Sequence, residues 1–199
     1  GFMFRPGFGS PAEIQRFLDS IPYNAKEECK PPERVFTEKN AHCFEGALFA
    51  AACLRELGYP PLVVDLKAWN DDDHVIAVFR ERGCWGAVAK SNFTTLRFRE
   101  PVYRNLRELA MSYFDFYFNT LGQKTLRAYS RPLKLERYDG CRWADGDDDL
   151  EYIADGFNQL PYYPLLGEEQ IAGLSPVPDH LLQAGLAGSN PEGLYVPKE

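Results

Sequence analysis

The chain has 199 residues, of which 45% are hydrophobic and 26% are charged, a balance that suits one globular domain with a substantial core. Its net charge of −7 and its lack of a long basic run argue against a nucleic-acid partner. No apolar run approaches the roughly 20 residues that a membrane helix needs, so we expect no membrane partner. Residues 1–10 contain no secretory apolar region, and the five scattered cysteines include no CxxC motif. Both features predict a cytoplasmic protein.

Helical patterns come first along the chain. A Ser-Pro pair followed by an apolar stripe predicts a helix over residues 10–21. Two consecutive prolines favour a loop over residues 22–42. Apolar residues then recur at helical spacing, and Gly58 with the two prolines after it ends the pattern. The sequence therefore predicts a helix of roughly four turns that begins at or next to Cys43.

Strand patterns follow, at residues 61–69, 73–81 and 84–98. The second and third flank a short turn, which indicates a hairpin. Residues 102–122 carry helical spacing and predict a second long helix, and residues 132–138 predict a further strand.

This order of elements indicates an α+β fold, with N-terminal helices packed on an antiparallel sheet. We expect one domain over residues 1–199, with a core at about residues 10–138. Residues 139–199 are acidic and then rich in proline, glycine and tyrosine. They predict a wrapping tail with short helices near residues 167–173 and 178–187.

The position of Cys43 carries a chemical meaning. The free N–H groups at a helix N-terminus favour a thiolate, so they lower the pKa of a cysteine there. The same N–H groups can hold the oxyanion that forms in acyl transfer. Cys43 is therefore a candidate nucleophile, and a buried structural cysteine is the alternative. Asn40, Tyr23 and Asn24 are polar candidates for a second oxyanion donor.

Only three histidines can serve as its base: His42, His74 and His180. His42 is next to the cysteine in sequence, where a side chain usually points elsewhere, and His180 lies in the polar tail. His74 begins a predicted strand, on the face that Ile76 and Val78 share. An exposed histidine among aspartates is the alternative interpretation of His74.

The possible hairpin registers limit which residue could orient the imidazole of His74. A turn of two or three residues places Lys90, Ser91 or Asn92 opposite His74, depending on the register. A side-chain amide can accept a hydrogen bond from an imidazole N–H, whereas a charged lysine cannot. We therefore expect Asn92 to orient His74, with Ser91 as the next candidate.

The arrangement over residues 40–95 resembles the transglutaminase-like superfamily, a rearranged relative of papain-type proteases. "NAHCFEGALFAAACLRELGYPP" carries Cys43, "DDDHVIAVF" carries His74, and "GCWGAVAKSN" stands where that family usually has a strand ending in an aspartate. The run that continues through "REPVYRNLRELAMSYFDFY" is similar to a little-characterised bacterial branch. The resemblance implies a papain-like α+β fold and a thiol acyl-transfer apparatus that needs no cofactor.

The expected function is a thiol-dependent hydrolase or acyl transferase that acts on an amide-type carbonyl through Cys43, His74 and Asn92. A peptide, a protein glutamine or a small amide would be the substrate. A binding module that keeps the fold without the chemistry is the main alternative, and an acyltransferase that uses a thioester is another. Zinc at His42, Cys43, Cys29 and His74, or calcium at residues 145–151, are metal alternatives that match no usual ligand spacing.

Overall fold

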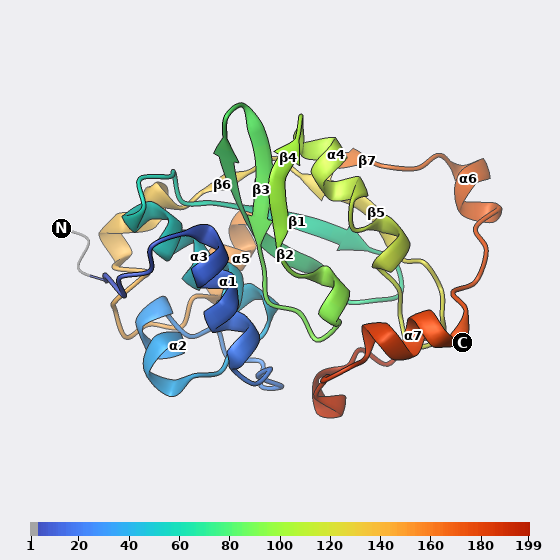
Figure 1. Cartoon of the computed structure of the whole chain (residues 1–199), viewed down its shortest axis with the longest axis horizontal. Helices are drawn as coiled ribbons and strands as arrows, with labels where there is room; N and C mark the ends of the chain where they lie inside the picture. The colour runs from blue at the N-terminus through green and yellow to red at the C-terminus, as the bar shows by residue number, and fades with distance from the viewer. Residues whose placement is uncertain (1–3) are drawn as a thin grey trace.

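A seven-stranded antiparallel sheet runs through the middle of the molecule (Figure 1). The computed structural model describes residues 4–199. Six strands lie in the order β4-β3-β2-β1-β5-β7, and β6 pairs with the edge of β1 that also carries β5. The strands are β1 Leu62–Ala68, β2 His74–Glu81, β3 Cys84–Val88, β4 Arg99–Tyr103, β5 Leu126–Ser130, β6 Leu133–Lys134 and β7 Tyr162–Pro164.

Helices flank this sheet, and the three N-terminal ones gather on one side of it in Figure 1. The α-helices are α1 Pro11–Ser20, α2 Pro32–Glu38, α3 Cys43–Glu56, α4 Leu106–Met111, α5 Glu151–Asp155, α6 Glu168–Ala172 and α7 Asp179–Gly185. Short 3-10 helices are η1 Thr94–Leu96, η2 Phe114–Phe116, η3 Leu135–Cys141, η4 Gly156–Gln159 and η5 Pro191–Gly193. The predicted α+β class is therefore confirmed.

Each face of the sheet packs against its own hydrophobic core. Val75 and Phe79 of β2 face the core that contains α1, α2 and α3. Ile76 and Val78 point to the opposite core, which contains α4 and the aromatic segment after it. This alternation is the one expected for a strand buried on both faces, because successive side chains point in opposite directions.

Helix α3 lies close to the sheet because small residues line it. A Cβ atom added at Gly46 would lie only 2.4 Å from the Cβ of Lys90, so no larger residue fits there without a shift. Lys90 is itself buried, and its ammonium group donates to the carbonyl oxygens of Leu18 and Ile21 at the end of α1. The start of α3, the end of α1 and the chain after β3 are therefore held together.

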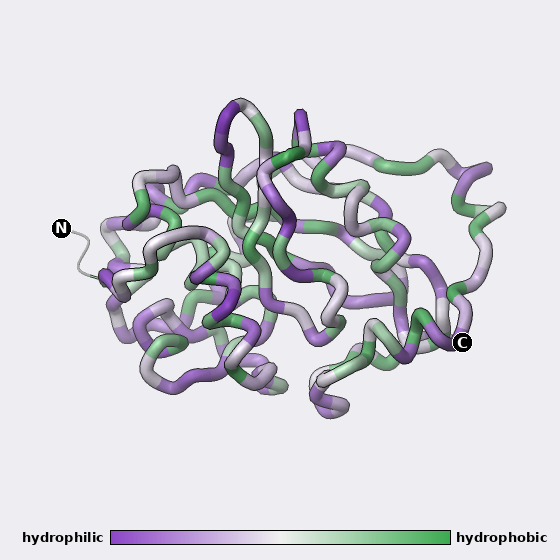
Figure 2. The backbone as a smooth tube through the Cα atoms, in the orientation of Figure 1, coloured by the Kyte–Doolittle hydropathy of each residue, from purple (hydrophilic) through white to green (hydrophobic). Residues whose placement is uncertain are grey.

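The β2–β3 hairpin has one of the expected registers. Glu81 pairs with Cys84, and the pairing continues to Ala77 opposite Val88. Arg82, at the turn, has a positive φ of 51°. This turn is the hydrophilic tip at the top of Figure 2.

Four sequence expectations need correction. Residues 22–42 contain helix α2, because Pro32 occupies its first turn, where the missing N–H costs nothing. Residues 102–122 do not form one helix: the structure has the end of β4, the six-residue α4 and a 3-10 turn there. Residues 84–98 form a strand only to Val88. Residues 132–138 form a strand only over Leu133–Lys134, because the 3-10 helix η3 begins at Leu135.

The last third of the chain contributes more structure than a tail. The short helices expected near residues 167–173 and 178–187 are present as α6 and α7. Strand β7 also joins the sheet beside β5, which the sequence pattern missed along with β5 itself. Within residues 4–199, no helix is long and apolar enough to cross a membrane.

Candidate functional site

Helix α3 begins at Cys43 because the residue before it caps the helix. The His42 ring Nδ1 accepts a hydrogen bond from the N–H of Glu45 at 3.3 Å. The Glu45 carboxylate accepts one in return from the N–H of His42 at 3.1 Å. This reciprocal pair is a capping box, with a histidine in the place usually taken by serine or threonine. His42 therefore has a structural role at the start of α3.

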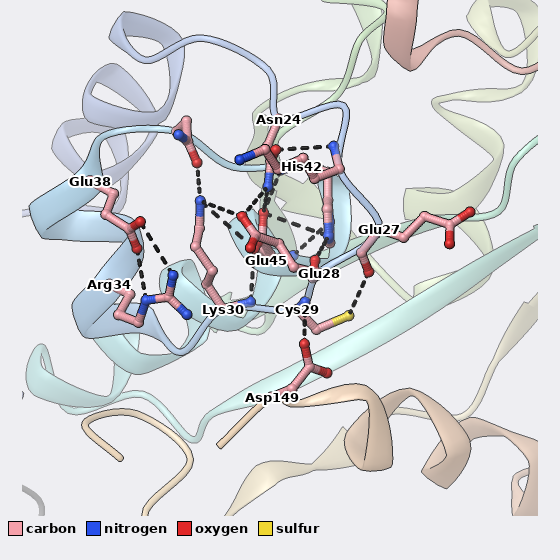
Figure 3. A network of polar contacts seen from close by, with 12 residues as sticks. Asn24, Glu27, Glu28, Cys29, Lys30, Arg34, Glu38, His42, Glu45 and Asp149 are labelled. Carbon is pink, nitrogen blue, oxygen red and sulfur yellow. Dashed lines mark hydrogen bonds and ion pairs between the residues drawn. The ribbon is translucent and has the colours of Figure 1, made fainter. Parts of the chain in front are cut away.

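The Glu45 carboxylate is fully buried at the centre of a polar network, shown in Figure 3. It accepts hydrogen bonds from the main-chain N–H of Lys30 at 2.8 Å and from the Asn24 side chain at 2.9 Å. The Lys30 ammonium lies 3.9 Å from the same carboxylate and also contacts Asn40. These contacts tie residues 24–30 to the first turn of α3 and so hold Cys43 in place.

The Cys43 thiol is partly exposed but closely surrounded by protein atoms. It donates to the main-chain carbonyl of Asp73 at 3.8 Å. Burial raises the pKa of Cys43 to about 12, and the Asp72 carboxylate adds to this rise. The N–H groups of Val75 and Phe44 act in the lowering direction but do not outweigh burial. The expectation of a lowered thiol pKa is therefore wrong: the N-terminal N–H groups of α3 are present, and desolvation exceeds their effect.

His74 is buried with 3% of its surface exposed. Its Nε2 lies 2.7 Å from the carbonyl oxygen of Leu96. A carbonyl only accepts, so Nε2 carries the proton and Nδ1 is left as a free acceptor. Burial lowers the pKa of His74 to about 4, so the ring is neutral at pH 7. Tyr113 and Tyr117 meet the ring in edge-on contacts.

Asn92 does not orient His74, and this expectation is corrected. The Asn92 side chain donates to the main-chain oxygen of Asn190 at 2.8 Å and accepts from the Asn190 N–H at 2.7 Å. The strand pairing ends at Val88, before it reaches the residues opposite His74. The register argument extended the hairpin too far, and the Leu96 carbonyl takes the orienting position. No sequence signal identifies that group, because every residue carries a carbonyl.

Two cavities meet at Cys43. A small one, with a volume of about 40 Å³, is lined by Cys43, His74 and Asn92 among others, so the structure brings the three predicted residues to one place. A larger one of about 660 Å³ is also lined by Cys43. Asp72 and Asp73 line both cavities. Within residues 4–199, no hydrogen bond joins the Cys43 sulfur to the His74 ring.

Among the candidates for a second oxyanion donor, Tyr23 lies at the site. Its hydroxyl interacts with the thiol and with the main-chain N–H of Cys43, and burial raises its pKa far above the ordinary range. It therefore stays protonated and can donate a hydrogen bond. Asn24 and Asn40 belong instead to the network around Lys30.

The buried Asp65 carboxyl lines the larger cavity next to the exposed Asp73, and sequence reasoning missed it. Asp65 is 5% exposed, and its Oδ2 accepts from the Tyr162 hydroxyl at 2.6 Å. Its Oδ1 has no hydrogen-bond partner among residues 4–199. Burial first, and then the neighbouring Asp73 carboxylate, raise the pKa of Asp65 to about 7. The apolar run around Asp65 in β1 could have indicated a buried aspartate, because residues on both faces of the strand, Val63 with Val64 and Leu66, are apolar, as in a strand buried on both sides.

The metal alternatives gain no support from the geometry. Within residues 4–199, no three His, Cys, Asp or Glu side chains are arranged to hold a metal ion. The proposed zinc ligands serve other contacts: His42 caps α3, and Cys29 lies beside Glu27 (Figure 3). Comparison of the sequence with protein-family models and with curated proteins finds no match.

Proposed function

We propose that the protein transfers acyl groups through a thioester at Cys43, acting on an amide-type carbonyl as a hydrolase or acyl transferase. One observation carries the proposal. A thiol at a helix start, an imidazole with a free Nδ1 and a protonated Tyr23 hydroxyl meet at one cavity. A nucleophile, a base and an oxyanion donor are the three groups that acyl transfer requires. The transglutaminase-like and papain-like assignment of the fold belongs to the same proposal.

In this mechanism the Cys43 sulfur attacks the carbonyl carbon while its proton passes to Nδ1 of His74. The cavity of about 40 Å³ is larger than the roughly 10–15 Å³ that one water needs, so a single water can relay this proton. The Tyr23 hydroxyl and the Cys43 N–H donate to the oxyanion. His74 then protonates the leaving nitrogen as the carbon–nitrogen bond breaks. Water or an amine cleaves the thioester and restores the thiol.

The electrostatics favour proton transfer during attack over a preformed thiolate. Burial keeps the Cys43 thiol protonated at pH 7, and burial also keeps His74 neutral. A neutral thiol and imidazole can still react if the base takes the proton as the sulfur–carbon bond forms. The proposal therefore predicts that the thiol reacts slowly until an acyl donor occupies the site.

An activated nitrophenyl acetate tests the proposal directly. We expect a burst of nitrophenol and an acetyl group on the peptide that contains Cys43, detected by mass mapping. Cys43→Ala should abolish both signals, and His74→Ala should reduce the burst rate. Cys141→Ser is the matched control, because Cys141 is an exposed thiol outside the site. A burst that survives Cys43→Ala would refute the assignment of the nucleophile.

A peptide-binding module without chemistry is the second candidate, and a specific observation favours it. Asp72 and Asp65 both act to raise the pKa of the Cys43 thiol, which is the opposite of what an activated cysteine needs. If the protein is such a binding module, the nitrophenyl acetate experiment should give no burst of nitrophenol. The folded protein should also carry no acetyl group on Cys43.

A further inference from the structure

Residues 190–198 contribute part of the wall of the small cavity at Cys43. Gly193, Leu194 and Tyr195 are part of its lining, beside Cys43 and His74. A Cβ atom added at Gly193 would lie 2.8 Å from the Tyr23 ring and 3.1 Å from Nδ2 of Asn92. The segment therefore passes in direct contact with the proposed oxyanion donor.

Two asparagine side chains hold this segment by its main chain. Asn92 binds the N–H and the carbonyl of Asn190, at 2.7 and 2.8 Å. Asn70 binds the N–H and the carbonyl of Lys198, both at 2.9 Å. The side-chain amide of each asparagine therefore forms hydrogen bonds with both the N–H and the carbonyl of one residue. A neighbouring strand makes the same pair of bonds in a β-sheet. One further bond runs from the Asn190 side chain to the carbonyl of Tyr23 at 3.1 Å.

Main-chain contacts of this kind can hold a peptide whatever its side chains, and in the bound segment a 3-10 turn at Pro191–Gly193 follows the first contact. A carboxamide offers one donor and one acceptor side by side, which matches the N–H and C=O of a single residue. A small amide cannot reach both asparagines, because they bind residues eight positions apart in this segment. Space for more chain lies beyond Asn92, in a cavity of about 360 Å³ that Asn92 and Gly188 help to line.

We propose that Asn92 and Asn70 form a binding track for the main chain of a peptide across the Cys43 cavity, and that residues 190–198 occupy this track in the resting protein. A peptide from another molecule must displace this segment before it reaches Cys43 from this side. The use of the track for a substrate rests on the proposed function, whereas peptide binding itself does not.

The test measures binding of a labelled synthetic peptide with the sequence of residues 188–199. The host is the full chain with Cys43→Ala, Asn190→Pro and Lys198→Pro, in which both main-chain N–H donors of the segment are removed and both asparagines remain. A tethered segment competes at an effective concentration in the millimolar range. Loss of two hydrogen bonds should therefore tighten binding of the free peptide by about tenfold relative to Cys43→Ala alone. A matched control carries Cys43→Ala and Glu199→Pro, which leaves both donors in place.

Two further measurements identify the track. A peptide with proline at the positions of Asn190 and Lys198 should bind at least about tenfold more weakly to the host, because it lacks both donors. Adding Asn70→Ala to the host should weaken binding of the native peptide by a similar factor. If circular dichroism shows that this host is unfolded, the variant with Cys43→Ala and Lys198→Pro replaces it. Its affinity for the free peptide should then be about threefold higher than that of Cys43→Ala alone.

Equal binding of the native and proline peptides to a folded host would overturn the proposal, as would the absence of any binding. These outcomes are independent of acyl transfer because every host lacks the thiol. Suppose that peptide binding depends on Asn70 and on the two main-chain donors, and that no acetyl group forms on Cys43 in the wild-type protein. That result would support the binding track and refute the proposed function. An acetyl group on Cys43 without peptide binding would do the reverse.

Discussion

The Nε2–H of His74 donates to the main-chain carbonyl of Leu96 across 2.7 Å. A main-chain carbonyl does not titrate, so it holds the imidazole in one tautomer wherever the ring is neutral. The free Nδ1 is the only basic atom of the ring that remains for chemistry. The geometry of the base therefore depends on the loop that contains η1, and every prediction about His74 follows from this contact.

The protonation state of His74 should be insensitive to Asn92. In ¹⁵N NMR spectra of the imidazoles, we expect His74 to be a neutral Nε2–H tautomer from pH 8 to pH 5, and to gain a proton near pH 4 because burial lowers its pKa to about 4. Asn92→Ala should leave the tautomer and this pKa unchanged, since Asn92 bonds to Asn190. A change of tautomer in Asn92→Ala would restore Asn92 as the orienting residue.

Alkylation of Cys43 should accelerate continuously with pH in the resting protein. Its thiol has a pKa of about 12, so the reactive thiolate fraction keeps rising to pH 10 and beyond. Iodoacetamide labelling followed by mass mapping measures this, with the exposed Cys141 as the internal reference. Asp72→Asn should raise the labelling rate of Cys43 at pH 8 by about threefold to tenfold, because one nearby negative charge is removed. Asp148→Asn, in an exposed turn, should have no effect, and a plateau of the wild-type rate below pH 9 would contradict the buried thiol.

Tyr23→Phe should lower the rate of acyl transfer and leave the fold intact. The ring that contacts Gly193 stays, and only the hydroxyl beside Cys43 is lost. Removal of one oxyanion donor costs about 10²–10³ in kcat. We expect kcat for nitrophenyl acetate to fall with KM nearly unchanged, as for a contact made only in the transition state. Tyr103→Phe on β4 is the control; an equal loss in that variant would mean that Tyr23 acts only through packing.

Glu45→Ala should destabilise the protein strongly. It removes the buried acceptor of the Lys30 N–H and of Asn24, and it leaves the Lys30 ammonium, which has no exposed side-chain surface, with only the partly exposed Glu28 carboxylate. Breaking a buried ion pair from one side costs about 3–5 kcal/mol. Urea unfolding should show this loss. Glu38→Ala breaks an exposed pair with Arg34 and should cost less than about 1 kcal/mol; similar losses in both variants would mean that the buried network does not hold the start of α3.

Asp65→Asn should remove part of the pH dependence of stability. The folded protein raises the pKa of Asp65 from 3.8 to about 7, so between these pH values the folded state binds more protons than the unfolded state. The free energy of unfolding therefore falls as pH rises from about 4 to about 7, and the contribution of the protonated carboxyl is lost above that range.

The asparagine stays neutral and can still accept from Tyr162. Urea unfolding at pH 5 and pH 8 should show that Asp65→Asn gains about 1–3 kcal/mol relative to wild type between the two pH values. Asp148→Asn should keep the wild-type dependence. An unchanged pH dependence in Asp65→Asn would show that the Asp65 carboxyl is already ionised at pH 5.

The sequence by itself determined some of the local elements, among them α3 and β2, and which residue types were available for chemistry. Helical spacing, ended by Gly58 and the prolines at 60 and 61, indicated α3 and its beginning at Cys43, because these signals act within a few residues. Period-two alternation indicated β2 and the face on which His74 lies, and short turn geometry limited the hairpin to a few registers, one of which is observed. These properties depend on neighbours along the chain.

Only the tertiary structure decided the partners and the charge states. The hydrogen bond of His74 goes to a carbonyl 22 residues away, and Asn92 binds a residue 98 positions further along the chain. The thiol pKa depends on how much protein surrounds Cys43, so burial reversed the direction that its helix position predicted. Each of these outcomes is set by segments that meet only when the chain has folded, and for that reason no pattern of neighbouring residues encodes them.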